Sequence, residues 1–286
     1  MAADPRRIEK PAFYALRPGG WRDLITILHL PYTAWHLSYV ALGAAAAPVL
    51  HLDRLAAALG AFFLAVGIGA HALDELNGRP LRTRLSDRVL IGLAAVSIVG
   101  AVAIGIVGAV TVSVSLVPLV AVGAFLVVAY NLELFGGRLH SDVWFALAWG
   151  AFPAFTGFWC NALELTVPGV AVTAGCYVLS VAQRRLSTPV RELRRRTVAV
   201  SGVQELRDGR RIALTSARLS APLDGALSAL SLAVVLEWIR LRRSRSRMAR
   251  YALDVGDTAS GGDIRDLLAA ELRDPTLEVA YPLDDG

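Results

Sequence analysis

The sequence predicts an all-α, polytopic transmembrane helical bundle of about seven spans with a short soluble C-terminal tail. The 286-residue chain is 55% hydrophobic and has a mean hydropathy of +0.51. Several of its apolar stretches are long enough to cross a bilayer core of roughly 30 Å. One of them, "LIGLAAVSIVGAVAIGIVGAV", lacks the polar face at helical spacing that a soluble core helix would show.

Apolar segments separated by basic loops define the expected spans. These spans cover residues 31–50, 55–76, 89–109, 112–132, 143–163, 167–184 and 222–239. Arginines gather in the N-terminal lead-in and in alternate loops, above all in an arginine-dense loop over residues 184–218. In the opposite loops, Arg54 is the single arginine. This bias predicts a cytosolic N-terminus.

Charge and cysteine usage indicate the compartment and the class of partner. The net charge of +5 comes from tails and loops, which indicates membrane topology and anionic lipid head groups rather than nucleic acid. Cys160 and Cys176 both lie in apolar segments, which favours small buried side chains over a disulfide or a metal pair. We expect a multi-pass protein of the inner (plasma) membrane. The lead-in has no apolar core, so we expect no cleaved signal.

Three regions organise the chain: a cytosolic lead-in over residues 1–23, a transmembrane domain over 24–241, and a basic linker with a short soluble tail over 242–286. If the seventh span crosses the membrane, the arginines after it lie on the side opposite the other basic loops, against the charge bias. The sequence therefore does not decide on which side of the membrane the tail lies. Within the tail, Asp263 can cap a short amphipathic helix. In the arginine-dense loop, alternating residues around Asp208-Gly209 predict a small β-hairpin.

The candidate site lies at the end of the second span. His71, Asp74 and Glu75 stand at i, i+3 and i+4, which places them on one side of a helix that Asn77 and Gly78 end. Carboxylates are disfavoured at a helix C-terminus and costly within a membrane. Two interpretations stay open. The acids could be neutralised at the water boundary by the arginines that follow, or they could hold Mg²⁺ next to a phosphate.

Several pieces of the sequence, in their order, resemble the UbiA-type intramembrane prenyltransferases over about residues 24–220. The pieces are "LHLPYTAWHLSYVALGAA", the acid-bearing helix end followed by "GRPLRTRLS", "YNLELF" and "WFALAWGAFPAFTGF". The resemblance implies a nine-helix, all-α enzyme that moves a polyprenyl group from its diphosphate to an aromatic or other small acceptor, with Mg²⁺ as cofactor. Asp74 matches the second acid of the first Asp-rich motif of the family, while His71 stands at the first acid and Gly78 at the third.

The predicted site residues follow from this resemblance and from the basic residues nearby. Asp74, Glu75 and His71 would do cation or proton work, with Asp74 and Glu75 as metal ligands. The second Asp-rich motif is missing, because the sixth span ends in "SVAQRRLSTPVRELRRR". Arginines there could clamp the diphosphate, since a guanidinium fork matches phosphate geometry. The predicted substrate-binding residues are Arg79, Arg82, Tyr130, Asn131, Arg138, Arg184 and Arg185.

Other functions stay open beside prenyl transfer. A noncatalytic protein or scaffold would bind an isoprenoid or anionic lipid without turnover. A sensor-like input module is suggested by "IRDLLAAELRDPTLEVAYPLDDG", which resembles a fragment of actinobacterial sensor histidine kinases. A metal or haem site is a weaker alternative, because the histidines lack a ligand spacing. Its members would be His29, His36, His71 and His140 together with Asp74. A homo-oligomer is also left open, because seven spans against the nine of the family would leave one side of the bundle uncovered.

Overall fold

The chain divides into two compact units, Met1–Leu236 and Glu237–Gly286. The computed structural model describes residues 12, 14–216, 218–223 and 225–226, and positions 240, 265–266, 269, 276 and 278. Most of the predicted span over residues 222–239 therefore lies outside the described residues, as does the predicted helix cap Asp263.

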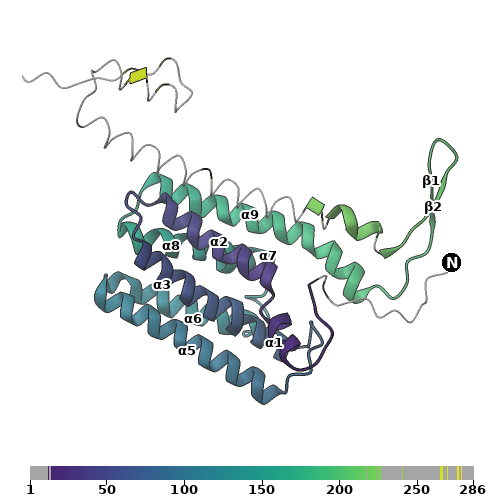
Figure 1. Cartoon of the computed structure of the whole chain (residues 1–286), viewed down its shortest axis with the longest axis horizontal. Coiled ribbons are helices and arrows are strands. Elements are labelled where there is room, and N and C mark those ends of the chain that lie inside the picture. The colour runs from purple at the N-terminus through teal and green to yellow at the C-terminus, as the bar shows by residue number, and fades with distance from the viewer. Residues whose placement is uncertain are drawn as a thin grey trace, which may run out of the picture. The chain divides into compact units, whose positions relative to one another are not determined.

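The first unit is helical apart from one small hairpin (Figure 1). Its elements are α1 (Trp21–Ile27), α2 (Leu30–Ala46), α3 (Leu52–Phe62), the π-helical η1 (Phe63–Ala70), α4 (His71–Leu76), α5 (Asp87–Thr111), the 3₁₀ turn η2 (Val114–Leu116), α6 (Val117–Asn131), α7 (Asp142–Ala146), the π-helical η3 (Leu147–Ala151), α8 (Phe152–Ala162), α9 (Val167–Arg191), the π-helical η4 (Glu192–Arg196), β1 (Val203–Glu205) and β2 (Arg211–Ala213). This arrangement confirms the all-α prediction at the coarse level.

Four helical runs of the described residues are long and apolar enough to cross a membrane: Leu52–Leu76, Asp87–Thr111, Val114–Asn131 and Asp142–Ala162. They coincide with the second to fifth predicted spans. The helix at the first predicted span, α2, has 17 residues, fewer than these four. The helix at the sixth, α9, is 25 residues long but ends in the polar stretch "QRRLSTPVR". By length and composition, the described part of the chain thus has four candidate spans, which indicates a membrane protein.

Hydroxyl side chains fix where three of the helices begin. Ser86 accepts a hydrogen bond from the Val89 N–H at the start of α5 (3.4 Å), and Ser141 accepts one from the Trp144 N–H at the start of α7 (3.3 Å). Thr166 caps α9 in the same way. Each cap satisfies a backbone donor that would otherwise lack a partner at a helix start.

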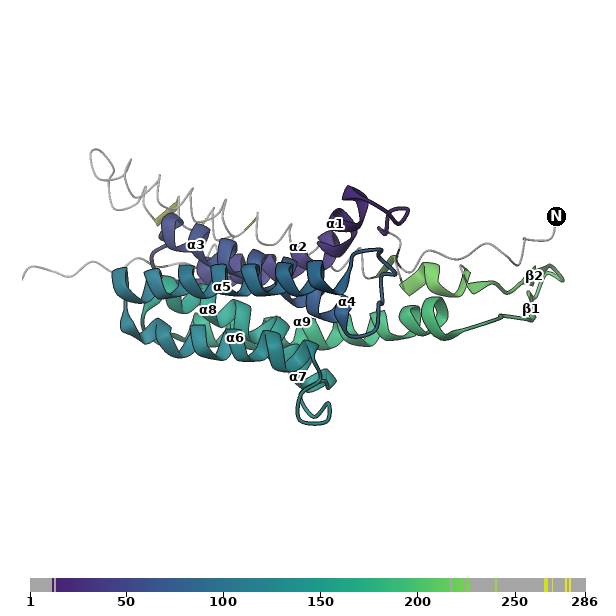
Figure 2. The ribbon, with the colours of Figure 1, turned by 90° about the horizontal axis from the view of Figure 1, so that it is seen from below.

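Helices α2 and α8 approach each other closely because of two glycines. A Cβ atom at Gly43 of α2 would overlap the carbonyl oxygen of Ala154, and one at Gly157 of α8 would overlap the carbonyl oxygen of Val40. Such small-residue contacts are a common way for membrane helices to pack backbone against backbone. The pair brings α2 and α8 together in the half of the bundle away from α5 and α6 (Figures 1 and 2).

The π-helical segments η1 and η3 lie in the middle of two of the membrane-crossing runs. Both contain glycine, in the sequences "FLAVGIGA" and "LAWGA". Val66 of η1 and Trp149 of η3 belong to one buried cluster, together with Tyr130 at the end of α6. A π-helical turn has more residues per turn than an α-helix, so it changes which side of the helix the following residues occupy.

The predicted hairpin in the arginine-dense loop is confirmed. Strands β1 and β2 pair antiparallel, with Val203 opposite Ala213. Gly209 supplies the positive φ of the turn, at 79°. Hydrogen bonds from the backbone and the guanidinium of Arg210 hold the pKa of Asp208 below its usual range. Alternation and turn chemistry were therefore sufficient signals for this element.

Candidate functional site

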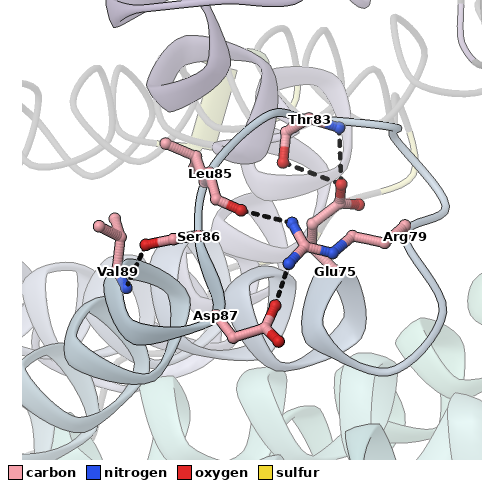
Figure 3. A network of polar contacts seen from close by, with 7 residues as sticks. All are labelled: Glu75, Arg79, Thr83, Leu85, Ser86, Asp87 and Val89. Carbon is pink, nitrogen blue, oxygen red and sulfur yellow. Dashed lines mark hydrogen bonds and ion pairs between the residues drawn. The ribbon is translucent and has the colours of Figure 1, made fainter.

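Glu75, one of the two predicted metal ligands, is fully buried at the end of α4 and bound by the loop that follows it. Its Oε2 accepts the backbone N–H of Leu81 (2.8 Å), and its Oε1 accepts both the N–H (2.8 Å) and the hydroxyl of Thr83 (2.9 Å). Figure 3 shows the two bonds from Thr83. Three donors compensate the buried carboxylate, as burial of a charged group requires. This geometry favours a structural role for Glu75 over the predicted catalytic and metal-binding roles.

Arg79 ties the same loop to the start of α5. Its Nη1 donates to the carbonyl oxygen of Leu85 (2.6 Å), and its Nη2 pairs with the carboxylate of Asp87 (Figure 3). Arg79 and Arg82 both adopt positive φ, near 54°. The guanidinium of Arg79 is thus engaged within the protein, which favours a structural role for it as well. Arg82 is exposed.

Asp23, at the end of the predicted lead-in, holds the other side of this loop. It is only 2% exposed, and its Oδ2 accepts the backbone N–H of Arg84 (3.0 Å) while its Oδ1 accepts that of Gly19 (3.0 Å). An acid in the first turn of a helix was the available signal, but α1 is too short to stand out as a helix in the sequence. Asp23 and Glu75 together fix the loop over residues 77–86.

His71 and Glu75, which share one side of the predicted helix, have different neighbours in the structure. The His71 ring stacks on that of His29, with centroids 4.7 Å apart and an angle of 8° between the planes, and its Nδ1 lies 3.2 Å from the Gly67 carbonyl oxygen. Glu75 binds the loop, and Asp74 acts electrostatically on Tyr130. The His71 and Glu75 side chains are thus engaged within the protein, and their joint site with Asp74 stays a prediction.

Tyr130 is the residue at which distant predicted site residues come together. Its ring stacks on His140 (centroids 4.5 Å apart) and meets Trp149 edge-on (5.4 Å). Its hydroxyl is buried and makes no hydrogen bond within the part of the chain that the structure describes. Four charged side chains act on this hydroxyl: Arg184, Arg191, Asp74 and Asp142. A buried hydroxyl without a partner is costly, and such groups are often found where a ligand binds.

Arg184 of α9 and Tyr130 share the Phe145 ring as a neighbour. Its side chain is 14% exposed, its Nε donates to Asp142 Oδ1 (2.7 Å), and its guanidinium carbon lies 5.0 Å from the centroid of the Phe145 ring. The preceding residue, Gln183, is buried, and its Oε1 has no hydrogen-bond partner among the described residues. The charged and polar groups around Tyr130 are therefore built largely by α9 and α7.

The remaining predicted residues have other surroundings. Asn131 is buried and donates to the Val127 carbonyl oxygen (2.7 Å), while its own carbonyl oxygen accepts from Asn77 (3.2 Å). Arg138 and Arg185 are exposed. Asp142 was missed in the sequence, because nothing in its local pattern indicates that an arginine 42 residues later reaches it.

The residues at the end of α4 do not fit a Mg²⁺ ion held by both predicted acids. Both oxygens of Glu75 already accept hydrogen bonds from the loop, so this carboxylate is engaged within the protein. Within the described residues, no group of three or more His, Cys, Asp or Glu side chains is placed to hold a metal ion. This finding also gives no support to a histidine metal or haem site.

An apolar cavity of about 450 Å³ lies among α3, η1, α5, α6, η3 and α8. Its walls are rich in alanine and glycine, which leave a space that larger side chains would fill. Polar residues in its lining are Asp53, Arg54, Thr111, Thr156 and Cys160. The hydroxyl of Thr156 is buried and makes no hydrogen bond among the described residues. The shape and chemistry suit a ligand with a large hydrocarbon part.

None of the predicted site residues lines this cavity. The link between the two regions is Trp149, which lines the cavity and also contacts the Tyr130 ring edge-on. The charged cluster around Tyr130 and the apolar cavity are thus neighbours separated by one aromatic pair.

No family model, curated protein or solved structure matches this chain.

Proposed function

We propose that this membrane protein binds a polyprenyl diphosphate. The hydrocarbon chain would occupy the apolar cavity, and the diphosphate would lie at the charged cluster around Tyr130. The observation that carries the proposal is the contact between Trp149 and Tyr130, because it joins an apolar cavity to a cluster of charges inside one helical bundle. A long apolar chain with an anionic end is the ligand class that this combination favours.

The dimensions of the cavity support a long hydrocarbon chain. Its lining includes Asp53 and Val66 in the same helical run. At 1.5 Å of rise per residue, thirteen helical steps give a length of about 20 Å. A volume of about 450 Å³ falls in the range of small-molecule sites.

The polar end supports an anionic group. The carboxylate of Asp142 that pairs with Arg184 is 66% exposed, and an ion pair of this kind contributes about 0–1 kcal/mol. A phosphate oxygen could replace that carboxylate at low cost. The guanidinium of Arg184 matches phosphate geometry, and the Tyr130 hydroxyl would gain a hydrogen-bond partner.

Transfer of the prenyl group to an aromatic or other small acceptor is the reaction that the UbiA-type resemblance implies. The noncatalytic alternative, binding of an isoprenoid or anionic lipid, is favoured by one observation: the three hydrogen bonds that occupy Glu75. Binding is common to both functions, so we propose binding first and treat transfer as the property to be measured.

The proposal includes a membrane topology. Helices α2 and α9 and the segment over residues 222–239 would add to the four clear spans to give seven. The basic loops would face the cytosol together with the N-terminus, and the inner (plasma) membrane is the proposed location.

The test is binding of prenyl diphosphates of increasing chain length to the purified full chain, with and without Mg²⁺, together with pyrophosphate release. Chain-length-dependent binding is expected, with weaker binding in Arg184→Gln and unchanged binding in Arg185→Gln, the exposed neighbour on the same helix. Pyrophosphate release that requires an acceptor would assign transfer. Binding without release would assign the noncatalytic function, and no binding of any chain length would overturn both.

A further inference from the structure

The helix α1 has two unlike faces, and one of them faces away from the protein. Asp23, Thr26 and Ile27 are buried, whereas Trp21 is 63% exposed, Leu24 44% and Ile25 38%. The exposed residues stand at i, i+3 and i+4, so they share one side of the helix. Two further exposed leucines flank the helix, Leu16 and Leu30.

The buried face fixes α1 at the level where membrane helices end. Ile27 packs in the same buried cluster as Ala72 and Leu73, near the end of the run Leu52–Leu76. Asp23 accepts the backbone N–H of Arg84, in the loop that joins this run to the next one. A loop between two membrane-crossing helices lies at the membrane surface, and α1 lies beside that loop (Figure 2).

Most of the exposed charges on α1 and on the loop beside it are basic. Arg22 places its guanidinium carbon 5.7 Å from the centroid of the Trp21 ring. Exposed arginines before α1 and in or next to the loop include Arg17, Arg82, Arg84 and Arg88, and the exposed acid there, Asp87, is paired with Arg79. The acid of α1, Asp23, is buried and therefore does not offset them at the surface.

We infer that α1 is an interfacial helix, with Trp21, Leu24 and Ile25 inserted at the boundary between head groups and acyl chains of an anionic leaflet. Tryptophan is enriched at this depth, and basic residues beside an apolar face attract anionic lipids. The helix is held near the end of the run Leu52–Leu76, because Ile27 on its buried face packs with Ala72 and Leu73. The inference does not depend on the proposed ligand, since no residue of α1 lines the cavity.

The test uses the full chain with both native cysteines replaced by alanine, reconstituted into phosphatidylcholine vesicles with or without phosphatidylglycerol. An environment-sensitive fluorophore is attached at Leu24→Cys or, as the control, at Arg207→Cys in the exposed hairpin turn. At position 24 we expect strong quenching by lipid nitroxides at shallow depth and little quenching by aqueous iodide. The control is expected to show the reverse.

Two results would overturn the inference. One is iodide quenching at position 24 as strong as at position 207. The other is protection at position 24 that rises with the protein-to-lipid ratio and disappears at one chain per vesicle, because a second copy would then cover the face. Phosphatidylglycerol is expected to increase lipid quenching at position 24. Equal quenching without it would overturn the inference that α1 prefers an anionic leaflet.

Discussion

Oε1 of Glu75 accepts two hydrogen bonds from one residue, the backbone N–H and the hydroxyl of Thr83, at 2.8 and 2.9 Å. This pairing explains how an acid persists at the end of an apolar helix. The compensating groups are backbone and hydroxyl donors of the next loop, so neither a metal ion nor an arginine is required there. The buried acid holds the loop between two of the candidate membrane-spanning helices in place through these hydrogen bonds.

Replacing Glu75 with glutamine is therefore expected to destabilise the protein. The NH₂ group of the glutamine would face the N–H group of Leu81 or of Thr83, so that hydrogen bond would be lost. An unsatisfied buried group costs about 1–3 kcal/mol. Thermal unfolding in detergent should show a lower Tm for Glu75→Gln, and a smaller change for Asp74→Asn, whose side chain is only partly buried. Equal stability of Glu75→Gln and the wild type would contradict the structural role.

Asp23 should protect the same loop from proteolysis. In Asp23→Ala the backbone N–H groups of Gly19 and Arg84 lose their acceptor, so α1 and the loop are expected to separate more often. Limited trypsin digestion, which can cut at the arginines of the loop, should become faster. Glu205→Gln, a change of an exposed acid in the hairpin, serves as the control and should leave the cleavage rate at this loop unchanged.

The contact between α2 and α8 predicts a contrast between glycines. Gly43→Ala and Gly157→Ala would force a methyl group against a backbone carbonyl, and overpacking of this kind costs about 1–3 kcal/mol or more. A Cβ at Gly175 of α9 meets nothing within 4 Å, so Gly175→Ala should be neutral or should stabilise by about 0.5–1 kcal/mol through helix propensity. Unfolding in detergent measures both, and a similar loss at all three positions would refute the close contact.

The sequence was informative wherever a local pattern decides the structure. Apolar length predicted the four clear spans, and Asp208-Gly209 between alternating residues predicted the hairpin. The partners of Glu75 could not be predicted, because the loop that carries them has positive φ angles at Arg79 and Arg82. Residues other than glycine rarely adopt such angles, so the sequence gives no signal for this loop conformation.

Long-range pairing was also beyond sequence reasoning. The ion pair between Arg184 and Asp142 joins α9 to the start of α7, and nothing local to either residue indicates the other. The separate neighbours of His71 and Glu75 could not be predicted either, because helical spacing gives a shared side of the helix but does not say which residues pack against it. The assignment of Arg184 to a phosphate stays a prediction.

The cavity makes a prediction that does not involve the charged cluster. Ala101→Phe would place a ring in the lining and should reduce binding of long-chain prenyl diphosphates more than that of short ones. Ala95→Phe, on the exposed side of the same helix α5, is the matched control and should bind every chain length as the wild type does. An equal effect of the two changes would show that the hydrocarbon chain lies elsewhere.

Tyr130→Phe is expected to weaken ligand binding without lowering the stability of the protein. Tyr130→Phe removes a buried hydroxyl that makes no hydrogen bond among the described residues, so the free energy of unfolding should stay the same or rise by up to about 1 kcal/mol. Binding of a prenyl diphosphate should weaken by roughly tenfold, the equivalent of one hydrogen bond to a charged group. A Tyr130→Phe protein that loses stability and keeps its affinity would place the hydroxyl in the folded structure rather than in the site. His140→Phe keeps a ring next to Tyr130 but removes the contact between the imidazole Nδ1 and the Tyr130 carbonyl oxygen (3.2 Å), so it measures the effect of the neighbouring side chain with the hydroxyl kept.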